Sequence, residues 1–285
     1  MASPYNPHIG SQDSNKLTFR FRPLLRRDFP IKDVITSCPT CHRFVAVSKP
    51  HGGPNSAPVS HHYQLVFTDG ACPSNGSPNA TAGLGIAYGT STSVPTQQLY
   101  IPVDDALDPS EKRTNQRAKL LAAIEGLERL AADTQAILCA PSDCLYESQY
   151  ARPSRVQPGA RRSWIVATDS KHVVCGMTDW LPNIWKHNGM RTMEGKTPAN
   201  LDLFFKLEDT IARYKSDFNV DIGFWLIPRE FNGIARAAAV RAPVASPRCR
   251  SDEPEPRGLV GYVPFRVVLT RVSFLQQSPC MFEHV

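Results

Sequence analysis

Two aspartates stand where apolar runs of the sequence stop. Asp69 follows the run 63–68, and Asp169 follows the run 164–168. Runs of this kind are typical of buried strands, and acids at the carboxyl ends of such strands are presented to one shared cleft. Carboxylates are also the groups through which proteins bind hard cations such as Mg²⁺. The pair therefore predicts a functional site at one edge of a sheet.

The elements that must position these acids follow from the hydrophobic pattern. Strands are predicted over 63–69, 83–89, 98–103, 163–169 and 220–227, and helices over 114–132, 173–177, 201–214 and 232–241. Pro102 indicates that the third of these strands lies at a sheet edge. The order of elements predicts an α/β domain with a mixed five-stranded sheet and helices on both faces.

The remaining segments show no such pattern. Residues 1–60 are expected to form a mostly irregular N-terminal extension, and the domain itself to span 61–242. Within it, the Pro- and Arg-containing stretch 133–162 is interpreted as a loop insertion, more readily a solvated loop than a phosphate-binding one. Residues 243–285, rich in Pro, Arg and Ser, are expected to form a poorly ordered tail.

The composition limits the class of protein. The 285 residues carry a net charge of +6, which is compatible with a polyanionic partner. No apolar run approaches the roughly 18 residues of a membrane span, and the first ten residues lack the pattern of a secretory signal. The eight cysteines are scattered, which fits a reducing compartment. We therefore expect an intracellular protein, nuclear or cytoplasmic, that does not bind membranes.

Several short sequence motifs, taken together, resemble those of a known family. In chain order they are Thr68-Asp69-Gly70-Ala71-Cys72, Ala82-Gly83-Leu84-Gly85-Ile86, Thr114-Asn115-Gln116-Arg117-Ala118, Thr168-Asp169-Ser170, the segment 185–196, Asn200-Leu201-Asp202-Leu203 and Ile227-Pro228-Arg229-Glu230-Phe231-Asn232. Their order and spacing resemble type 1 ribonuclease H, in particular its fungal branch. The resemblance covers 63–242 apart from the insertion, and it implies the ribonuclease H-like fold.

The resemblance also implies a chemistry. The family hydrolyses the RNA strand of RNA–DNA hybrids with two Mg²⁺ (or Mn²⁺) ions, about 4 Å apart, held by four acids. Asp69 and Asp169 match the first and third acids and would be the metal ligands. Lys119 stands at the second position, and Arg236 is assigned to the fourth.

These two cations change the charge of the predicted site. Four carboxylates sum to −4, whereas two carboxylates, one ammonium and one guanidinium sum to 0. A cation has no lone pair to donate and repels the ion beside it. We therefore expect Lys119 and Arg236 to turn inward and replace the metal ions in a salt-bridge cluster. In the alternative interpretation, both side chains point to solvent.

Other acids nearby could rescue metal binding. Glu125 and Glu128 lie on the same predicted helix as Lys119 but about 240° and 180° around it, and so cannot face the same cleft. Glu230, in the short loop before the last helix, could reach the site.

Candidate substrate contacts also follow from the resemblance. Asn75, Asn115 and Gln116 are at positions that would hydrogen-bond 2′-hydroxyls in the minor groove of a hybrid. Alternatively, Asn75 satisfies a turn, and the other two complete a helix start. The family's aromatic and basic handle, which holds the DNA strand, would be formed here by Trp185, Lys186, Arg191 and Lys196.

A further motif lies outside the resemblance. Cys38 and Cys41 have the spacing of a zinc knuckle, with His61 and His62 about twenty residues further on. A lone Cys-x-x-Cys pair is more often a metal-free turn, and that interpretation is preferred from the sequence.

Three hypotheses for the function remain, in this order of preference. The first is a ribonuclease H-family protein that engages RNA–DNA hybrid or a related duplex with weakened or lost hydrolysis. The second is an active hybrid endoribonuclease that uses Asp69, Asp169 and another acid. The third is a non-catalytic interaction module, which the fold alone does not exclude. Whether the chain is an enzyme is left open by Lys119 and Arg236.

Overall fold

The computed structural model describes residues 17–23, 30–39, 41–47, 61–75, 77, 80–93, 96–109, 112–138 and 161–242. All of them belong to one compact unit, Met1–Ser246. The predicted tail 243–285 and most of the predicted insertion 133–162 lie outside the described residues. Residues 133–138 are not loop, because the helix that precedes them continues to Leu138.

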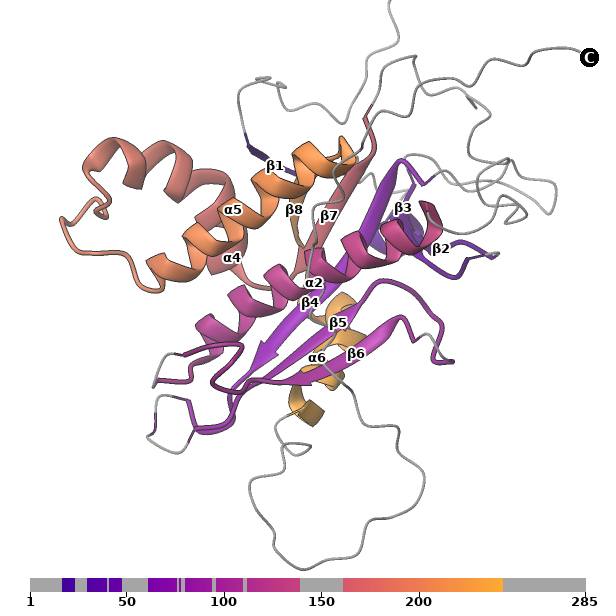
Figure 1. Cartoon of the computed structure of the whole chain (residues 1–285), viewed down its shortest axis with the longest axis horizontal. Helices are drawn as coiled ribbons and strands as arrows, with labels where there is room; N and C mark the ends of the chain where they lie inside the picture. Colours follow the sequence, from indigo (N-terminus) through magenta and orange to yellow (C-terminus); the bar gives the residue numbers. More distant parts are fainter. Residues whose placement is uncertain are drawn as a thin grey trace, which may run out of the picture. The chain divides into compact units, whose positions relative to one another are not determined.

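The centre of the unit is a mixed eight-stranded sheet (Figure 1). Its strands are β1 (Thr18–Arg20), β2 (Ile35–Ser37), β3 (Phe44–Ala46), β4 (Tyr63–Ala71), β5 (Gly83–Ala87), β6 (Gln98–Pro102), β7 (Ser163–Thr168) and β8 (Asp221–Leu226). The order is β1-β8-β7-β4-β3-β2, with β5 also paired to β4 and β6 to β5. Strands β1, β8, β7 and β4 run parallel, and the other pairs are antiparallel.

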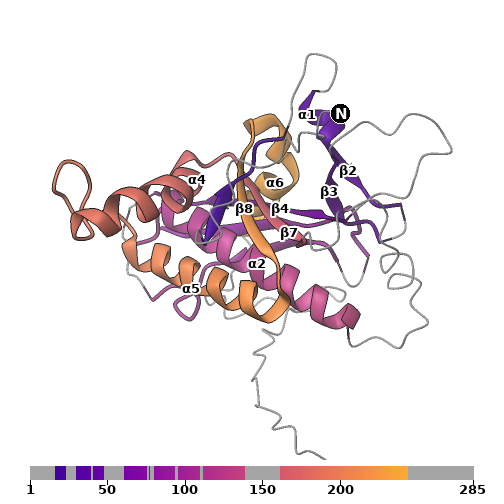
Figure 2. The ribbon, with the colours of Figure 1, turned by 90° about the horizontal axis from the view of Figure 1, so that it is seen from above.

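Helices cover both faces of this sheet. They are α1 (Ile31–Val34), α2 (Asn115–Leu138), α4 (Lys171–Cys175), the π-helix η1 (Gly176–Trp185), α5 (Leu201–Phe218) and α6 (Gly233–Arg241), with short 3-10 turns η2 (Lys186–Asn188) and η3 (Arg229–Asn232). Figure 2 shows α2 and α5 side by side on one face and α6 on the other. The alternation of β4 explains both layers, because Val66 packs with α2 whereas Leu65 and Phe67 pack with Ala235 of α6.

The structure confirms the mixed α/β architecture and corrects the number of strands from five to eight. The additional strands β1, β2 and β3 come from the first 60 residues, so the prediction of a mostly irregular extension was wrong for them. Each has only three residues, which is too short to show a strand periodicity in the sequence. The prediction that Pro102 marks an edge is confirmed, since β6 pairs with β5 alone.

A second correction concerns the segment after β7. The sequence predicted a short helix followed by a polar loop, but the chain stays helical as η1 from Gly176 to Trp185. This helix includes Pro182 and buries Met177, Leu181 and Trp185. None of the described helices combines the length and the apolar character that crossing a membrane requires.

One close approach between layers positions the candidate site. A Cβ atom added to Gly70 of β4 would lie 2.2 Å from the carbonyl carbon of Ala118 and 2.4 Å from the backbone nitrogen of Lys119. Only glycine allows the backbone of α2 to rest directly on the strand at this point. The side chain of Lys119 is thereby fixed above the end of β4.

Candidate functional site

The structure brings Asp69 and Asp169 together. Strands β4 and β7 are parallel neighbours, with Phe67 opposite Ala167, so Asp69 and the residue that follows β7 lie side by side. Their side chains are 7% and 11% exposed. Two carboxylates therefore share one largely buried position at the carboxyl ends of two strands.

Lys119 occupies the space between these carboxylates. Its Nζ donates a hydrogen bond to Oδ1 of Asp169 at 2.7 Å and another to Oδ1 of Asp69. The backbone N–H of Gly70 also donates to Oδ1 of Asp69, at 2.9 Å. The lysine side chain is 22% exposed. It lies in the orientation that the salt-bridge hypothesis requires rather than pointing to solvent.

Arg236 lies outside this cluster. It is exposed on α6, and the structure gives it no ion pair or hydrogen bond within the described part of the chain. The reason is the orientation of α6, whose Ala235 and Ala239 are fully buried against the sheet and so direct the intervening Arg236 away. Its assignment to the fourth acid position was therefore wrong in geometry.

Asn232 is the residue of the last helix that lies beside the cluster. It is fully buried at the junction of η3 and α6, and its Nδ2 donates to the carbonyl oxygen of Thr68 at 3.1 Å. Its Oδ1 is buried without a hydrogen-bond partner among the described residues. The i, i+4 pair of alanines in the sequence was the signal that could have oriented this helix and identified Asn232.

These groups do not fit a two-metal site. Two carboxylates and one ammonium sum to −1, and Asn232 adds an amide without charge. One oxygen of each carboxylate, Oδ1 of Asp69 and Oδ1 of Asp169, already accepts a hydrogen bond from Lys119. Within the described residues, Glu125 pairs with Arg129, Glu128 bonds to Tyr214, and Glu230 is exposed on η3. None of these acids joins the cluster.

Comparison with characterised proteins matches about half of the chain to ribonucleases H. Ribonuclease H1 of Mus musculus is 28% identical over 145 residues, which are 51% of this chain and 38% of that protein. Ribonuclease H of Bordetella pertussis is 29% identical over 150 residues, which are 53% of this chain and 70% of that protein. About half of the chain is therefore similar in sequence to type 1 ribonucleases H.

Other comparisons add less. No protein-family model matches the chain. The solved structure of RNase H1 from Halobacterium salinarum covers 65% of this chain and 99% of its own, with 17% identity and a TM-score of 0.37, which is too low to support an argument. The chain spans 38% of the length of the mouse relative. The similarity therefore does not by itself assign an activity, a substrate or partners to this chain.

Two of the predicted substrate-contact residues stabilise the start of α2. Oδ1 of Asn75 accepts from the backbone N–H of Asn115 at 2.8 Å, and Oδ1 of Asn115 accepts from that of Cys72 at 2.7 Å. Both residues and Gln116 are exposed. Because Asn115 and Lys119 are four residues apart, these amides lie on the helix face that carries the ion cluster.

A positioning residue that the sequence did not reveal is Arg117. It forms ion pairs with the buried Asp108 at 2.8 Å and with Asp202 of α5 at 2.7 Å. The hydrogen bond from Arg117 lowers the pKa of the Asp202 carboxyl. The pairs connect the first turn of α2 to α5, and only the folded chain brings these three residues together.

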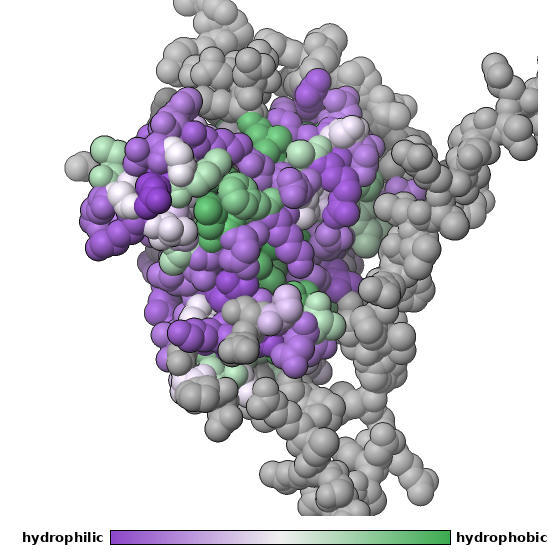
Figure 3. Space-filling view, turned by 60° about the vertical axis from the view of Figure 1, so that its left-hand side comes forward, coloured by the Kyte–Doolittle hydropathy of each residue, from purple (hydrophilic) through white to green (hydrophobic). Residues whose placement is uncertain are grey.

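The segment predicted to be a handle is only partly available to a ligand. Trp185 is 5% exposed and packs against Phe204, with ring centroids 5.1 Å apart, so the prediction that its ring can stack on a base was wrong. The three cations of the handle are exposed and locally paired: Lys186 with Glu208, Lys196 with Glu194, and Arg191 with the carbonyl oxygen of Gly195. Figure 3, with the left-hand side of Figure 1 turned forward, shows a face on which hydrophilic residues predominate.

A pH-dependent contribution to stability arises beneath this segment. His172 packs 5.2 Å from Phe204 and 5.9 Å from Trp180, and its Nε2 is buried without a hydrogen-bond partner among the described residues. Burial lowers its pKa below the ordinary value. The unfolded chain therefore takes up this proton first, and stability falls as the pH drops below about 6.5.

Replacing this histidine should remove that dependence. In His172→Phe we expect the melting temperature to change less between pH 7 and pH 5 than in the natural chain. Thermal unfolding followed by circular dichroism at several pH values measures the difference. The exposed His187 provides the matched control, and His187→Gln should keep the natural slope. An unchanged slope in His172→Phe would contradict the assignment.

Proposed function

We propose that this chain engages RNA–DNA hybrid as a ribonuclease H-family protein that has lost two-metal phosphodiester hydrolysis. The observation that carries the proposal is the position of Lys119, whose ammonium hydrogen-bonds both Asp69 and Asp169. The cation already neutralises part of the charge that would otherwise attract metal ions.

The physical argument against hydrolysis concerns both charge and geometry. An ion entering between the carboxylates would have to displace an ammonium that is hydrogen-bonded to each of them. Mg²⁺ gives up its hydration shell reluctantly and is bound through carboxylate oxygens together with the phosphates of the substrate. In this site a Mg²⁺ ion would gain only the carboxylates of Asp69 and Asp169 as charged ligands. Asn232 adds no charge, and its side-chain N–H is held by a hydrogen bond to the carbonyl oxygen of Thr68. Two-ion activation of water therefore lacks its ligands.

The argument for engagement concerns the surface around the cluster. The exposed amides of Asn75, Asn115 and Gln116 lie at the start of α2, where they can donate to 2′-hydroxyls. The exposed cations of Lys186, Arg191 and Lys196 can exchange their local partners for phosphates, and the net charge of +6 favours a polyanion. Both groups of residues keep their side chains accessible.

The proposal is tested with the natural chain and a labelled hybrid. We expect binding by fluorescence anisotropy that weakens as salt increases, with no cleavage in Mg²⁺ or Mn²⁺. A Gln116→Ala/Lys196→Gln variant should bind roughly tenfold more weakly, with a salt slope reduced by about 1 for the lost cation. Arg241→Gln, on the far face of the sheet at α6, is the matched control and should bind as the natural chain does.

Two other results would replace the proposal. Metal-dependent cleavage by the natural chain that disappears in Asp69→Asn would show an active endoribonuclease. The absence of any binding to hybrid, single-stranded RNA or duplex DNA at low salt would leave an interaction module on the ribonuclease H scaffold.

A further inference from the structure

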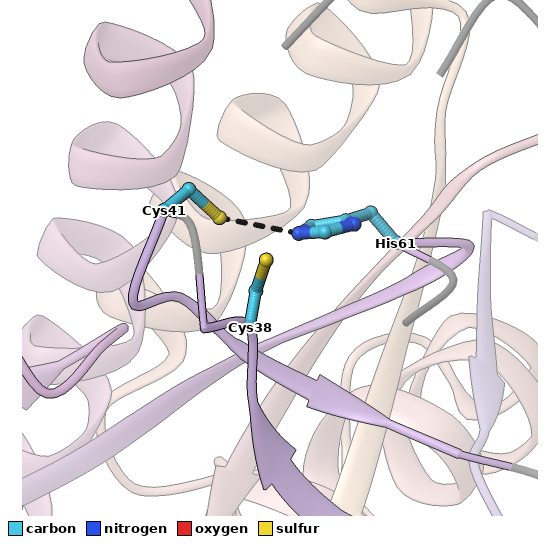
Figure 4. Close-up of side chains that lie close together, drawn as sticks. All are labelled: Cys38, Cys41 and His61. Atoms are coloured by element: carbon cyan, nitrogen blue, oxygen red, sulfur yellow. Dashed lines mark hydrogen bonds between the residues drawn. The ribbon is translucent and has the colours of Figure 1, made fainter. Parts of the chain in front are cut away.

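Three side chains outside the ion cluster converge on one point. The ligand atoms of Cys38, Cys41 and His61 all lie within 4.8 Å of one another, and Sγ of Cys41 is 3.2 Å from Nε2 of His61. Figure 4 shows the two sulfur atoms and the imidazole ring directed toward each other. Cys38 and His61 are buried, and Cys41 is half-buried.

We propose that Cys38, Cys41 and His61 form a zinc site that fastens the β2–β3 hairpin to the start of β4. Zinc–sulfur and zinc–nitrogen bonds of about 2.3 and 2.0–2.1 Å place tetrahedral ligand atoms roughly 3.5 to 3.8 Å apart. The observed separations are within about 1 Å of that range, so side-chain rotations suffice to complete it. Two thiolates and one imidazole are a donor set that favours zinc over harder cations.

The backbone holds the cysteine turn in the geometry that a metal knuckle needs. The N–H of His42 donates to the carbonyl oxygen of Cys38 at 2.8 Å, and the N–H of Cys38 donates to that of Arg43 at 2.9 Å. His42 has a φ of 61°, which turns the chain sharply directly after Cys41. Both sulfur atoms are thus presented to the same side of the turn.

Contacts with the rest of the domain fix the turn opposite His61. The side chain of Gln97 donates to the carbonyl oxygen of Cys41 at 2.9 Å, and the N–H of Thr90 donates to that of His42 at 2.8 Å. His61 stands two residues before β4, and β3 pairs with β4 at a single position, Val45 with Gln64. A metal at this point would reinforce a junction that has little sheet pairing.

A competing role for the cysteines fits less well. A Cys38–Cys41 disulfide would leave His61 without a role at the same point, whereas zinc uses all three groups. In the part of the chain that the structure describes, no fourth ligand joins the group, and we assign the fourth position to water.

The test measures zinc in the full chain purified under reducing conditions. We expect about one zinc per chain by elemental mass spectrometry, and about none in Cys38→Ser or His61→Ala. His42→Asn, which keeps a residue tolerant of positive φ, and Cys175→Ser, which changes a cysteine elsewhere, are the matched controls and should retain zinc. Chelation should lower the melting temperature of the natural chain and leave that of Cys38→Ser unchanged.

A second measurement needs no variant. Zinc should protect Cys38 and Cys41 of the natural chain from alkylation, as read by peptide mass spectrometry, while half-buried Cys175 reacts equally with and without the ion. Added Co²⁺ should give the absorption of a tetrahedral thiolate site. A natural chain that binds no zinc, or one isolated with a Cys38–Cys41 disulfide, would overturn the proposal.

Discussion

A chain carrying Lys119→Glu and Asn232→Asp together should bind Mg²⁺ and cleave the RNA strand of an RNA–DNA hybrid, whereas we expect no cleavage by the natural chain. The two substitutions replace the ammonium and the buried amide beside Asp69 with carboxylates. The charge of the cluster changes from −1 to −4, and four oxygen ligands converge on the position that Lys119 occupies. The expected result is metal-dependent hydrolysis by the double variant that exceeds the hydrolysis measured with the natural chain.

Thermal unfolding gives a readout of the same change that does not depend on activity. Without divalent ions, four neighbouring carboxylates repel one another, and the variant should unfold at a lower temperature than the natural chain. Mg²⁺ should then stabilise the variant by about 2.7 kcal/mol at a concentration 100 times its dissociation constant. The natural chain should show no such shift, because Lys119 occupies the site.

The matched control follows from the correction of the last helix. Lys119→Glu with Arg236→Asp likewise introduces one glutamate and one aspartate, but position 236 is exposed on α6 and away from the cluster. It should remain inactive or stay far below the first variant. Equal activity of the two double variants would show that Asn232 does not take the fourth ligand position.

The site was predictable where local pattern decides geometry. Asp69 and Asp169 stand at the carboxyl ends of buried strands. Because these strands are parallel neighbours, their carboxyl ends lie at the same edge of the sheet, and the two aspartates lie side by side. The resemblance to type 1 ribonuclease H placed Lys119 beside them. Asn232 escaped prediction because the pair Ala235 and Ala239 was not used to orient the last helix, whose rotation is set by the close approach of Ala235 to Gly85 of β5.

Other features depended on contacts that the sequence does not encode locally. Three-residue strands such as β1 and β3 exist because a neighbouring strand offers an unpaired edge. Trp185 is buried because η1 continues as a helix through a segment expected to be polar loop. Cys38 and His61 are far apart in sequence. The pairing of β3 with β4 and the contacts of the cysteine turn with Thr90 and Gln97 bring them together.

Gly70→Ala should be the most damaging single substitution at the site. The new methyl group would lie 2.2 Å from the carbonyl carbon of Ala118, and all three clashing atoms of α2 belong to the backbone. The helix must therefore move away from β4, which disturbs the packing of the layer and the position of Lys119. Overpacking of this kind costs typically 1–3 kcal/mol, and we expect the upper end, about 3 kcal/mol. At roughly 2–4 °C per kcal/mol, the melting temperature should fall by about 6–12 °C.

Gly233→Ala is the matched control, because a Cβ at Gly233 meets no atom within 4 Å. It lies in the first turn of α6, where alanine should be neutral or slightly stabilising.

The two substitutions should also differ in their effect on function. Both substitutions are added to the Lys119→Glu/Asn232→Asp chain and assayed at a temperature where the resulting chains are still folded. Gly70→Ala should abolish the gained hydrolysis, because it displaces position 119. Gly233→Ala should preserve the hydrolysis. Hydrolysis that survives Gly70→Ala would show that the ion cluster tolerates movement of α2, and that the close approach of helix and strand serves stability alone.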